Sequence, residues 1–147
     1  RQAVQNISQS LTHDGIFICT VPNASVIRER VASGSACNAH YRIEYTTAGQ
    51  DKSTVYGQEY TFWLSDAIDN CPEYLIDKDN FIAVCGDHGL LLLECQNFRD
   101  VYLTQGPDFH DLLKVMGVTD GPDNRLQMTR DEMTIAELYD IYMFTKK

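Results

Sequence analysis

Residues 16–21 (IFICTV) constrain the fold of this chain more than any other segment. The run is apolar almost throughout, which is typical of a central strand whose sheet is covered on both faces. Pro22 ends the run, and Asn23 is placed to cap a helix over residues 24–32. A buried strand followed at once by a helix predicts a layered α/β architecture.

The rest of the chain alternates between helical and extended patterns. Apolar side chains recur at helical spacing in residues 1–11, 73–86, 98–105 and 109–116. Strand patterns occur in residues 41–45, 56–64, 90–95 and 138–145. The first two of these strand segments predict an antiparallel hairpin, and Thr129 with Glu132 predicts a capping box that opens a short helix. Residues 117–127 are expected to form a loop.

The charge of the chain limits what it can bind unaided. Its formal net charge is −9, with only 12 Lys and Arg in 147 residues. A domain that binds nucleic acid through its own charge usually shows a basic face, whereas here only Arg28, Arg30 and Arg42 are loosely grouped. A polyphosphate ligand would therefore find most of its positive charge outside this chain. The five cysteines are an odd number without a C-x-x-C spacing, which indicates free thiols in a reducing compartment.

The sequence contains no motif of a complete active site. Its nine glycines form no G-x-G-x-x-G turn, and no P-loop, H-E-x-x-H, G-x-S-x-G or zinc-ligand spacing occurs. No apolar run approaches the roughly 20 residues that a membrane helix needs. The isolated histidines are interpreted as solvated turn residues: His13, His40, His88 and His110. These patterns predict no catalytic residue, no cofactor-binding residue, no metal site and no membrane contact.

Three segments nevertheless match the pattern of a known family. Residues 15–23 (GIFICTVPN) are similar to a strand that ends in a Thr-Pro-Asn turn, with Val21 inserted or substituted in it. Residues 57–75 lead from GQEYTF to CPEYL, similar to a G-x-x-Y-x-F strand before a Pro-Glu-Phe/Tyr-Leu helix start. Residues 132–146 are similar to a closing helix and strand. In this order the segments resemble the mRNA cap guanine-N7 methyltransferase family, although residues 104–128 are shorter and less similar than the family's region.

The resemblance covers only the second half of the family's catalytic domain. It implies an α/β fold, the C-terminal half of a class I (Rossmann-like) methyltransferase fold with an inserted antiparallel hairpin. Residues 1–147 would form the cap-side, or acceptor-side, part of the domain. S-adenosylmethionine would be bound by the missing N-terminal half upstream. The helical pattern of residues 1–11 has no capping signal before it, which fits a chain that begins within an element. Without the donor-binding half, we expect the chain to be inactive alone.

The same resemblance implies the partners and the location. The partners would be the capped 5′ end of pre-mRNA and the missing N-terminal half, with no metal and no membrane. The enzyme would act in the nucleus, or in the cytoplasm if it belongs to a virus or to a cytoplasmic capping system. Two alternatives stay open at this point: another class I methyltransferase with a small-molecule acceptor, and a non-catalytic cap-binding or regulatory subunit.

Two cap-binding residues, Glu73 and Tyr139, follow from the resemblance. A carboxylate accepts two parallel hydrogen bonds from the N1–H and exocyclic amine of guanine, which adenine cannot offer. An aromatic residue supplies a stacking face or a hydroxyl donor. Without the resemblance, Glu73 together with Asn70 and Pro72 fits a helix-capping arrangement. Tyr139 likewise fits a packing residue at the head of a strand.

Overall fold

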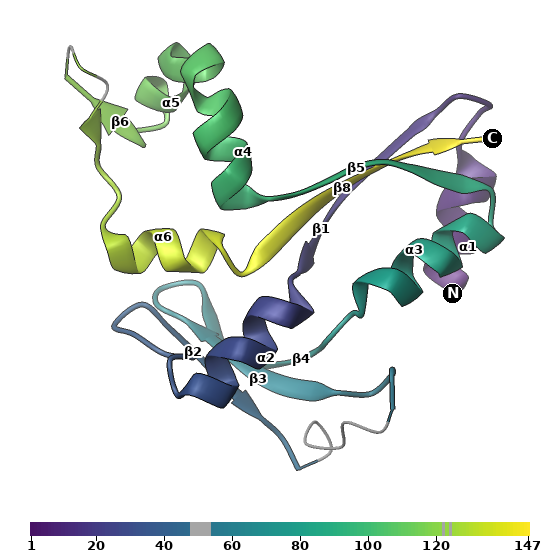
Figure 1. Cartoon of the computed structure of the whole chain (residues 1–147), viewed down its shortest axis with the longest axis horizontal. Coiled ribbons are helices and arrows are strands. Elements are labelled where there is room, and N and C mark those ends of the chain that lie inside the picture. The colour runs from purple at the N-terminus through teal and green to yellow at the C-terminus, as the bar shows by residue number, and fades with distance from the viewer. Residues whose placement is uncertain (48–53, 122, 124) are drawn as a thin grey trace.

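The chain folds into two three-stranded antiparallel sheets, with helices packed against them and a helical arm that extends from one sheet (Figure 1). The computed structural model describes residues 1–47, 54–121, 123 and 125–147. Its helices are α1 (Gln2–Ser10), α2 (Ala24–Ser33), α3 (Lys78–Asp87), α4 (Phe98–Gln105), the 3-10 helix η2 (Gly106–Phe109), α5 (His110–Val115) and α6 (Arg130–Ala136). Its strands are β1 (Ile16–Pro22), β2 (Tyr41–Tyr45), β3 (Glu59–Leu64), β4 (Ile68–Tyr74), β5 (Leu90–Asn97), β6 (Thr119–Asp120), β7 (Arg125–Leu126) and β8 (Tyr139–Lys146). The chain therefore mixes helices and strands as expected, and all its described strand pairs are antiparallel.

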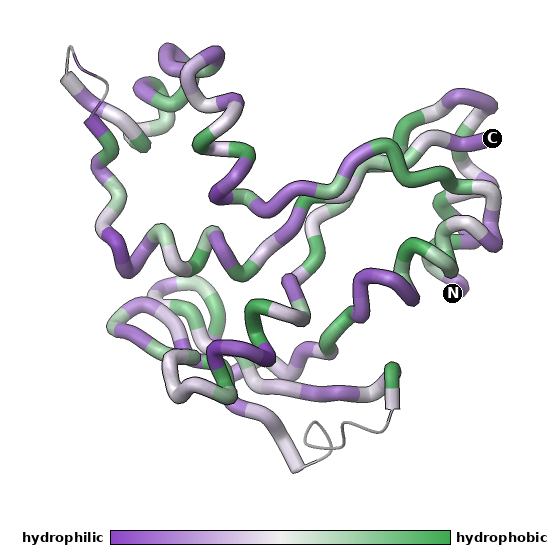
Figure 2. The backbone as a smooth tube through the Cα atoms, in the orientation of Figure 1, coloured by the Kyte–Doolittle hydropathy of each residue, from purple (hydrophilic) through white to green (hydrophobic). Residues whose placement is uncertain are grey.

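Sheet A has the strand order β1-β8-β5, so the last strand of the chain lies between two earlier ones. One of its faces packs against α1 and α3 around the fully buried Phe144 and Cys85. Phe17 is paired with Phe144 across the strands, and their rings stack at 5.9 Å between centroids. The hydrophobic stretch of β5 lies at the end of sheet A beside α1 and α3 (Figure 2).

The prediction of a central strand over residues 16–21 was right about the strand and wrong about its surroundings. β1 is an edge strand that pairs antiparallel with β8, and its side chains Phe17, Cys19 and Val21 face the core. The side chains of Ile16 and Ile18 point away from the core and are 47% and 57% exposed. An apolar run cannot tell which of its faces is covered, because both faces carry apolar residues. We call this second side the open face of sheet A. It is formed by Ile16, Ile18, Leu91, Glu94, Gln96, Ile141 and Met143, and Val101 and Gln105 of α4 border it beside Ile18.

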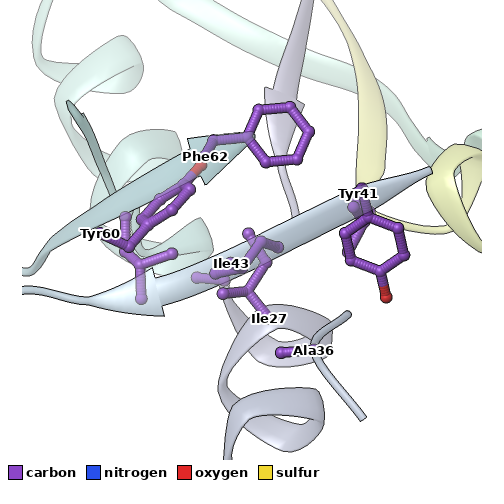
Figure 3. Packing of buried hydrophobic residues seen from close by; sticks show 9 residues of the cluster. Ile27, Ala36, Tyr41, Ile43, Tyr60 and Phe62 are labelled. Carbon is purple, nitrogen blue, oxygen red and sulfur yellow. The ribbon is translucent and has the colours of Figure 1, made fainter. Parts of the chain in front are cut away.

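Sheet B is the meander β2-β3-β4, and α2 packs on one of its faces. Ile27 of α2 lies against Ile43, beside the buried rings of Tyr60 and Phe62 (Figure 3). The antiparallel pairing predicted for residues 41–45 and 56–64 is present between β2 and β3, but the second strand begins at Glu59 and not at residue 56.

A third strand, β4, replaces the predicted start of the helix at residue 73. The helix begins instead at Lys78, where the side chain of Asp77 accepts a hydrogen bond from the backbone N–H of Asn80 at 3.1 Å. Pro72 has no N–H to donate to a sheet, and it is tolerated because β4 is an edge strand. Residues 68–74 carry little strand propensity, so the pairing with β3 decides their conformation.

The arm contains α4, η2, α5, α6 and a two-stranded ribbon, β6-β7. The helices predicted over residues 98–105 and 109–116 are confirmed, and so is the Thr129–Glu132 capping box at the start of α6. Residues 117–127, predicted as a loop, contain the short ribbon. Within the described part of the chain, no helix has both the length and the apolar character to cross a membrane.

Candidate functional site

The candidate site begins with a row of three side chains across sheet B. Tyr60 on the central strand is paired with Tyr45 on β2 and with Glu73 on β4. Residues directly opposite each other on antiparallel strands point to the same face of the sheet, so these three side chains lie side by side. Tyr60 belongs to the buried core beneath α2. The row therefore places a carboxylate at the margin of an aromatic core.

Tyr60 holds Glu73 directly. Its hydroxyl donates a hydrogen bond of 2.5 Å to Oε2 of Glu73. The ring of Tyr60 is 1% exposed, and burial followed by the bond to Glu73 raises the pKa of this hydroxyl far above its usual value. The hydroxyl therefore stays protonated and acts only as a donor toward the carboxylate. Among the described residues, none donates a hydrogen bond to the other oxygen, Oε1, so Glu73 keeps acceptor capacity for a ligand.

Tyr139 approaches the same carboxylate from sheet A. It is the first residue of β8, it is half-buried, and its ring lies 6.1 Å from that of Phe98. Burial, and then the negative charge of Glu73, raise the pKa of Tyr139 to about 12. Tyr139 also packs against the core cluster that contains Tyr60, the hydrogen-bond partner of Glu73. The structure thus brings together both residues that the sequence singled out.

The helix-capping interpretation of Glu73 is wrong. Glu73 lies inside β4 and pairs with Tyr60, and the cap of α3 is the side chain of Asp77. Sequence analysis did not single out Tyr60 and so missed its contact with Glu73. The sequence signal for this contact is the spacing of Tyr60 and Glu73 on adjacent strands. That spacing predicts a contact only when the register of the two strands is known.

Positive charge near this site is limited. Arg28 on α2 slightly offsets the rise that burial causes in the pKa of Tyr45, which places the guanidinium close to the row. Its Nη2 donates to Oε1 of Gln58 at 3.0 Å, and its Nη1 lies 3.9 Å from Asp77. Arg28 is therefore already engaged by residues of this chain.

Histidines and cysteines form no second site in the described ranges. The described residues contain no group of three or more His, Cys, Asp or Glu side chains that could hold a metal ion. His13 and His110 lie beside the exposed carboxylates of Asp14 and Asp111. Cys85 is buried and Cys19 is half-buried, and this burial raises the pKa of each thiol to about 11 and keeps both protonated near neutral pH.

Comparison with known proteins identifies the class to which this chain belongs. Residues 1–147 match the model of the mRNA (guanine-N(7))-methyltransferase domain, so the chain is a member of that family. It is 33% identical over 99% of its length to an mRNA cap guanine-N(7) methyltransferase of Cryptococcus neoformans var. neoformans, of which it covers 24%. It is 32% identical over its whole length to mRNA cap guanine-N(7) methyltransferase 1 of Oryza sativa subsp. japonica, of which it covers 42%.

The chain is also 28% identical, over 99% of its length, to an mRNA cap guanine-N(7) methyltransferase of Saccharomyces cerevisiae. It covers 37% of that protein. The chain thus spans less than half the length of each of these relatives. The family membership confirms the resemblance inferred from the three sequence segments.

Proposed function

We propose that this chain is the acceptor-side part of an enzyme that transfers a methyl group to N7 of the mRNA cap guanine. In this proposal Glu73 and Tyr139 form part of the guanine pocket. The observation that carries it is that Tyr60 holds the carboxylate of Glu73 by a hydrogen bond while Tyr139 packs against the same core cluster as Tyr60. The names of the curated relatives agree with this reaction.

The carboxylate of Glu73 fits the edge of guanine. The N1–H and the exocyclic amine are adjacent donors, and each can meet one carboxylate oxygen. Oε1 has no partner among the described residues, and Oε2 retains a lone pair beside the bond from Tyr60. Adenine presents an acceptor at N1, and this would face the carboxylate unfavourably. The pocket would therefore select guanine.

For methylation at N7, the acceptor side of the protein needs mainly to align the guanine. N7 of guanine already carries a lone pair, so its methylation needs no general base. The protein must hold N7 in line with the donor methyl group, and this makes proximity and orientation the dominant contribution. Methylation leaves a positive charge on the base. Both the carboxylate of Glu73 and the ring of Tyr139 would favour that charge.

The methyl donor that the family implies is S-adenosylmethionine. A cofactor of this kind is usually received at a glycine-rich turn after a strand of an α/β sheet. In the described part of the chain, β1 is followed directly by Asn23 and β5 by Phe98, so neither strand end offers such a turn. The residues present do not fit the donor. We propose that it is bound by an N-terminal half outside this chain, and we expect the chain alone to bind it no more tightly than about 100 μM.

The open face of sheet A and the free edge of β1 are the proposed contact with that half. Ile16 and Ile18 are exposed here, and large apolar surfaces of this kind usually mark an interface. The proposed place of action is the nucleus, or the cytoplasm for a viral or cytoplasmic capping system.

Replacement of Glu73 by alanine in the full-length protein tests the pocket. The change removes two charge-assisted hydrogen bonds and should lower kcat/KM on capped RNA by about 30- to 1000-fold, on the order of 2–4 kcal/mol. Glu44→Ala is the matched control, because Glu44 is an exposed carboxylate on the opposite face of sheet B. Equal activities of the two variants would refute the pocket role. A full-length protein that binds capped RNA but transfers no methyl group would instead be a cap-binding subunit.

A further inference from the structure

Three polar side chains meet where the strands of sheet A end, close to Tyr139. Asp140, the second residue of β8, is only 5% exposed. Nδ2 of Asn23 donates to both of its oxygens, at 3.0 Å and 2.8 Å. Nδ2 of Asn97 donates to Oδ1 at 3.0 Å. We call Asn23, Asn97 and Asp140 the amide–carboxylate clamp.

Both amides of the clamp are fixed in orientation by helix capping. Oδ1 of Asn23 accepts a hydrogen bond from the backbone N–H of Val26 at the start of α2. Oδ1 of Asn97 accepts one from the N–H of Arg99 at the start of α4. Because each oxygen is used at a helix start, each NH2 group must point toward Asp140. The clamp thus ties two helix starts to the beginning of β8.

The clamp also holds the backbone of Tyr139 and its neighbours. Nδ2 of Asn97 lies 3.0 Å from the carbonyl oxygen of Tyr139 and 2.9 Å from that of Glu137. The backbone N–H of Asn23 donates to the carbonyl of Leu138 at 2.7 Å. Consecutive residues leading into β8 are therefore held by the two asparagines. The position from which the Tyr139 side chain leaves the strand is fixed as a result.

The energetic cost of this arrangement points to a role in positioning. A buried carboxylate loses its hydration and is tolerated only when hydrogen bonds replace it. An apolar residue could close the end of the sheet without that cost. A hydrogen-bonded carboxylate, however, fixes direction as well as contact, because its partners must lie along its lone pairs.

We propose that the amide–carboxylate clamp positions Tyr139 in the guanine pocket, so that Asn97 and Asp140 set the affinity for the cap without touching it. This proposal rests on the proposed function of Glu73 and Tyr139. It assigns to the clamp residues a positioning role and no contact with the base. The clamp should therefore change the affinity for capped RNA only through the position of Tyr139.

Two variants of the full-length protein weaken the clamp without removing the helix caps. Asn97→Ser keeps an oxygen that can cap α4 and loses the NH2 group that binds Tyr139 and Asp140. Asp140→Asn turns one acceptor into a donor that faces the NH2 group of Asn23. Each should raise KM for capped RNA about tenfold and leave KM for S-adenosylmethionine within about twofold, because a displaced pocket residue affects one substrate.

A reciprocal exchange and a matched control complete the set. The double variant Asn23→Asp with Asp140→Asn restores a donor facing an acceptor and still caps α2, so KM for capped RNA should recover to within about threefold of the wild type. Asn38→Ser is the control. Asn38 also uses its oxygen in a local turn and donates across to another element, but to Asp131 and Thr134 in α6. This variant should leave both KM values unchanged.

The decisive comparison repeats Asn97→Ser and Asp140→Asn in a Tyr139→Ala background. If the clamp acts through Tyr139, neither change raises KM for capped RNA further once Tyr139 is gone. The same tenfold rise in both backgrounds would overturn the positioning role and leave the guanine pocket standing. Normal KM and kcat in Tyr139→Ala alone would overturn the pocket role of Tyr139 and the positioning proposal with it. If Asp140→Asn does not fold, Asn97→Ser carries the same comparison.

Discussion

The two sheets are built alike, yet they present opposite surfaces to their surroundings. Each has three antiparallel strands, and each packs one face against helices. The outer face of sheet B carries Arg42, Glu44 and Trp63, with the guanidinium of Arg42 5.7 Å from the centre of the Trp63 ring. The open face of sheet A carries exposed Ile16 and Ile18, with Glu94 and Gln96 at its α4 end. Sheet B therefore suits contact with water, whereas sheet A suits contact with further protein.

The difference also separates the proposed tasks of the two sheets. Sheet B contributes Glu73 and its supporting Tyr60 from within a closed core. Sheet A contributes Tyr139 from the strand that lies at its centre, and its uncovered face is the proposed contact with the donor-binding half. The guanine pocket would thus form between sheet B and sheet A, and only sheet A would contact the donor-binding half.

The largest expected effect tests whether the packed faces of the two sheets are equally important. Phe144 in sheet A is 0% exposed and Phe62 in sheet B is 1% exposed. Phe144→Ala and Phe62→Ala should each lower the free energy of unfolding by about 3–5 kcal/mol, because each leaves a cavity in a close-packed core. Denaturant titration measures this loss. A loss below about 1 kcal/mol at either site would show that the packed face there is not a true core.

A smaller effect should separate the outer faces. Ile18→Thr in the full-length protein should cost about 1–3 kcal/mol of unfolding free energy if the open face of sheet A is covered there. Glu44→Ala on the outer face of sheet B should change it by less than about 0.5 kcal/mol. Equal, near-zero losses at both positions would break the comparison, because the open face would then be exposed in the complete protein as well.

The smallest effect concerns the support of Glu73 by Tyr60. Tyr60→Phe keeps the buried ring and removes the hydroxyl that donates to Oε2. We expect kcat/KM on capped RNA to fall about tenfold, since a hydrogen bond to a charged group contributes roughly 1.5 kcal/mol or more. Tyr45→Phe is the control, because Tyr45 is the other neighbour in the row and is not bonded to Glu73. An equal fall in both variants would show that Tyr60 does not act through Glu73.

The sequence predicted most of the elements and both residues of the candidate site. Its main error was the helix start at residue 73, because Pro72 and Glu73 resemble the first turn of a helix. Asn70 even has a positive φ of 48°, which is unusual for a strand residue. Only the pairing with β3, which is a tertiary contact, makes this segment extended.

Sequence patterns could not predict the geometry of the candidate site. Glu73 and Tyr139 were identified through family resemblance, and no periodicity would have placed them near each other. Their proximity depends on the separate folding of β4 in sheet B and β8 in sheet A. The hydrogen bond from Tyr60 depends on the register of β3 against β4, and the clamp around Asp140 depends on three strand ends meeting.

The most direct test of the guanine pocket is the methylation rate of Glu73→Gln on guanine-capped and inosine-capped RNA, measured together with its melting temperature. Inosine lacks the exocyclic amine, so the wild type should prefer the guanine cap by about 10- to 100-fold, the value of one hydrogen bond to a charged group. The glutamine variant has a single acceptor, and it should be slow on guanine caps and lose most of this preference while melting normally. Wild-type rates and preference in Glu73→Gln would contradict the account, because a glutamate that binds the guanine edge cannot be replaced by an amide without loss.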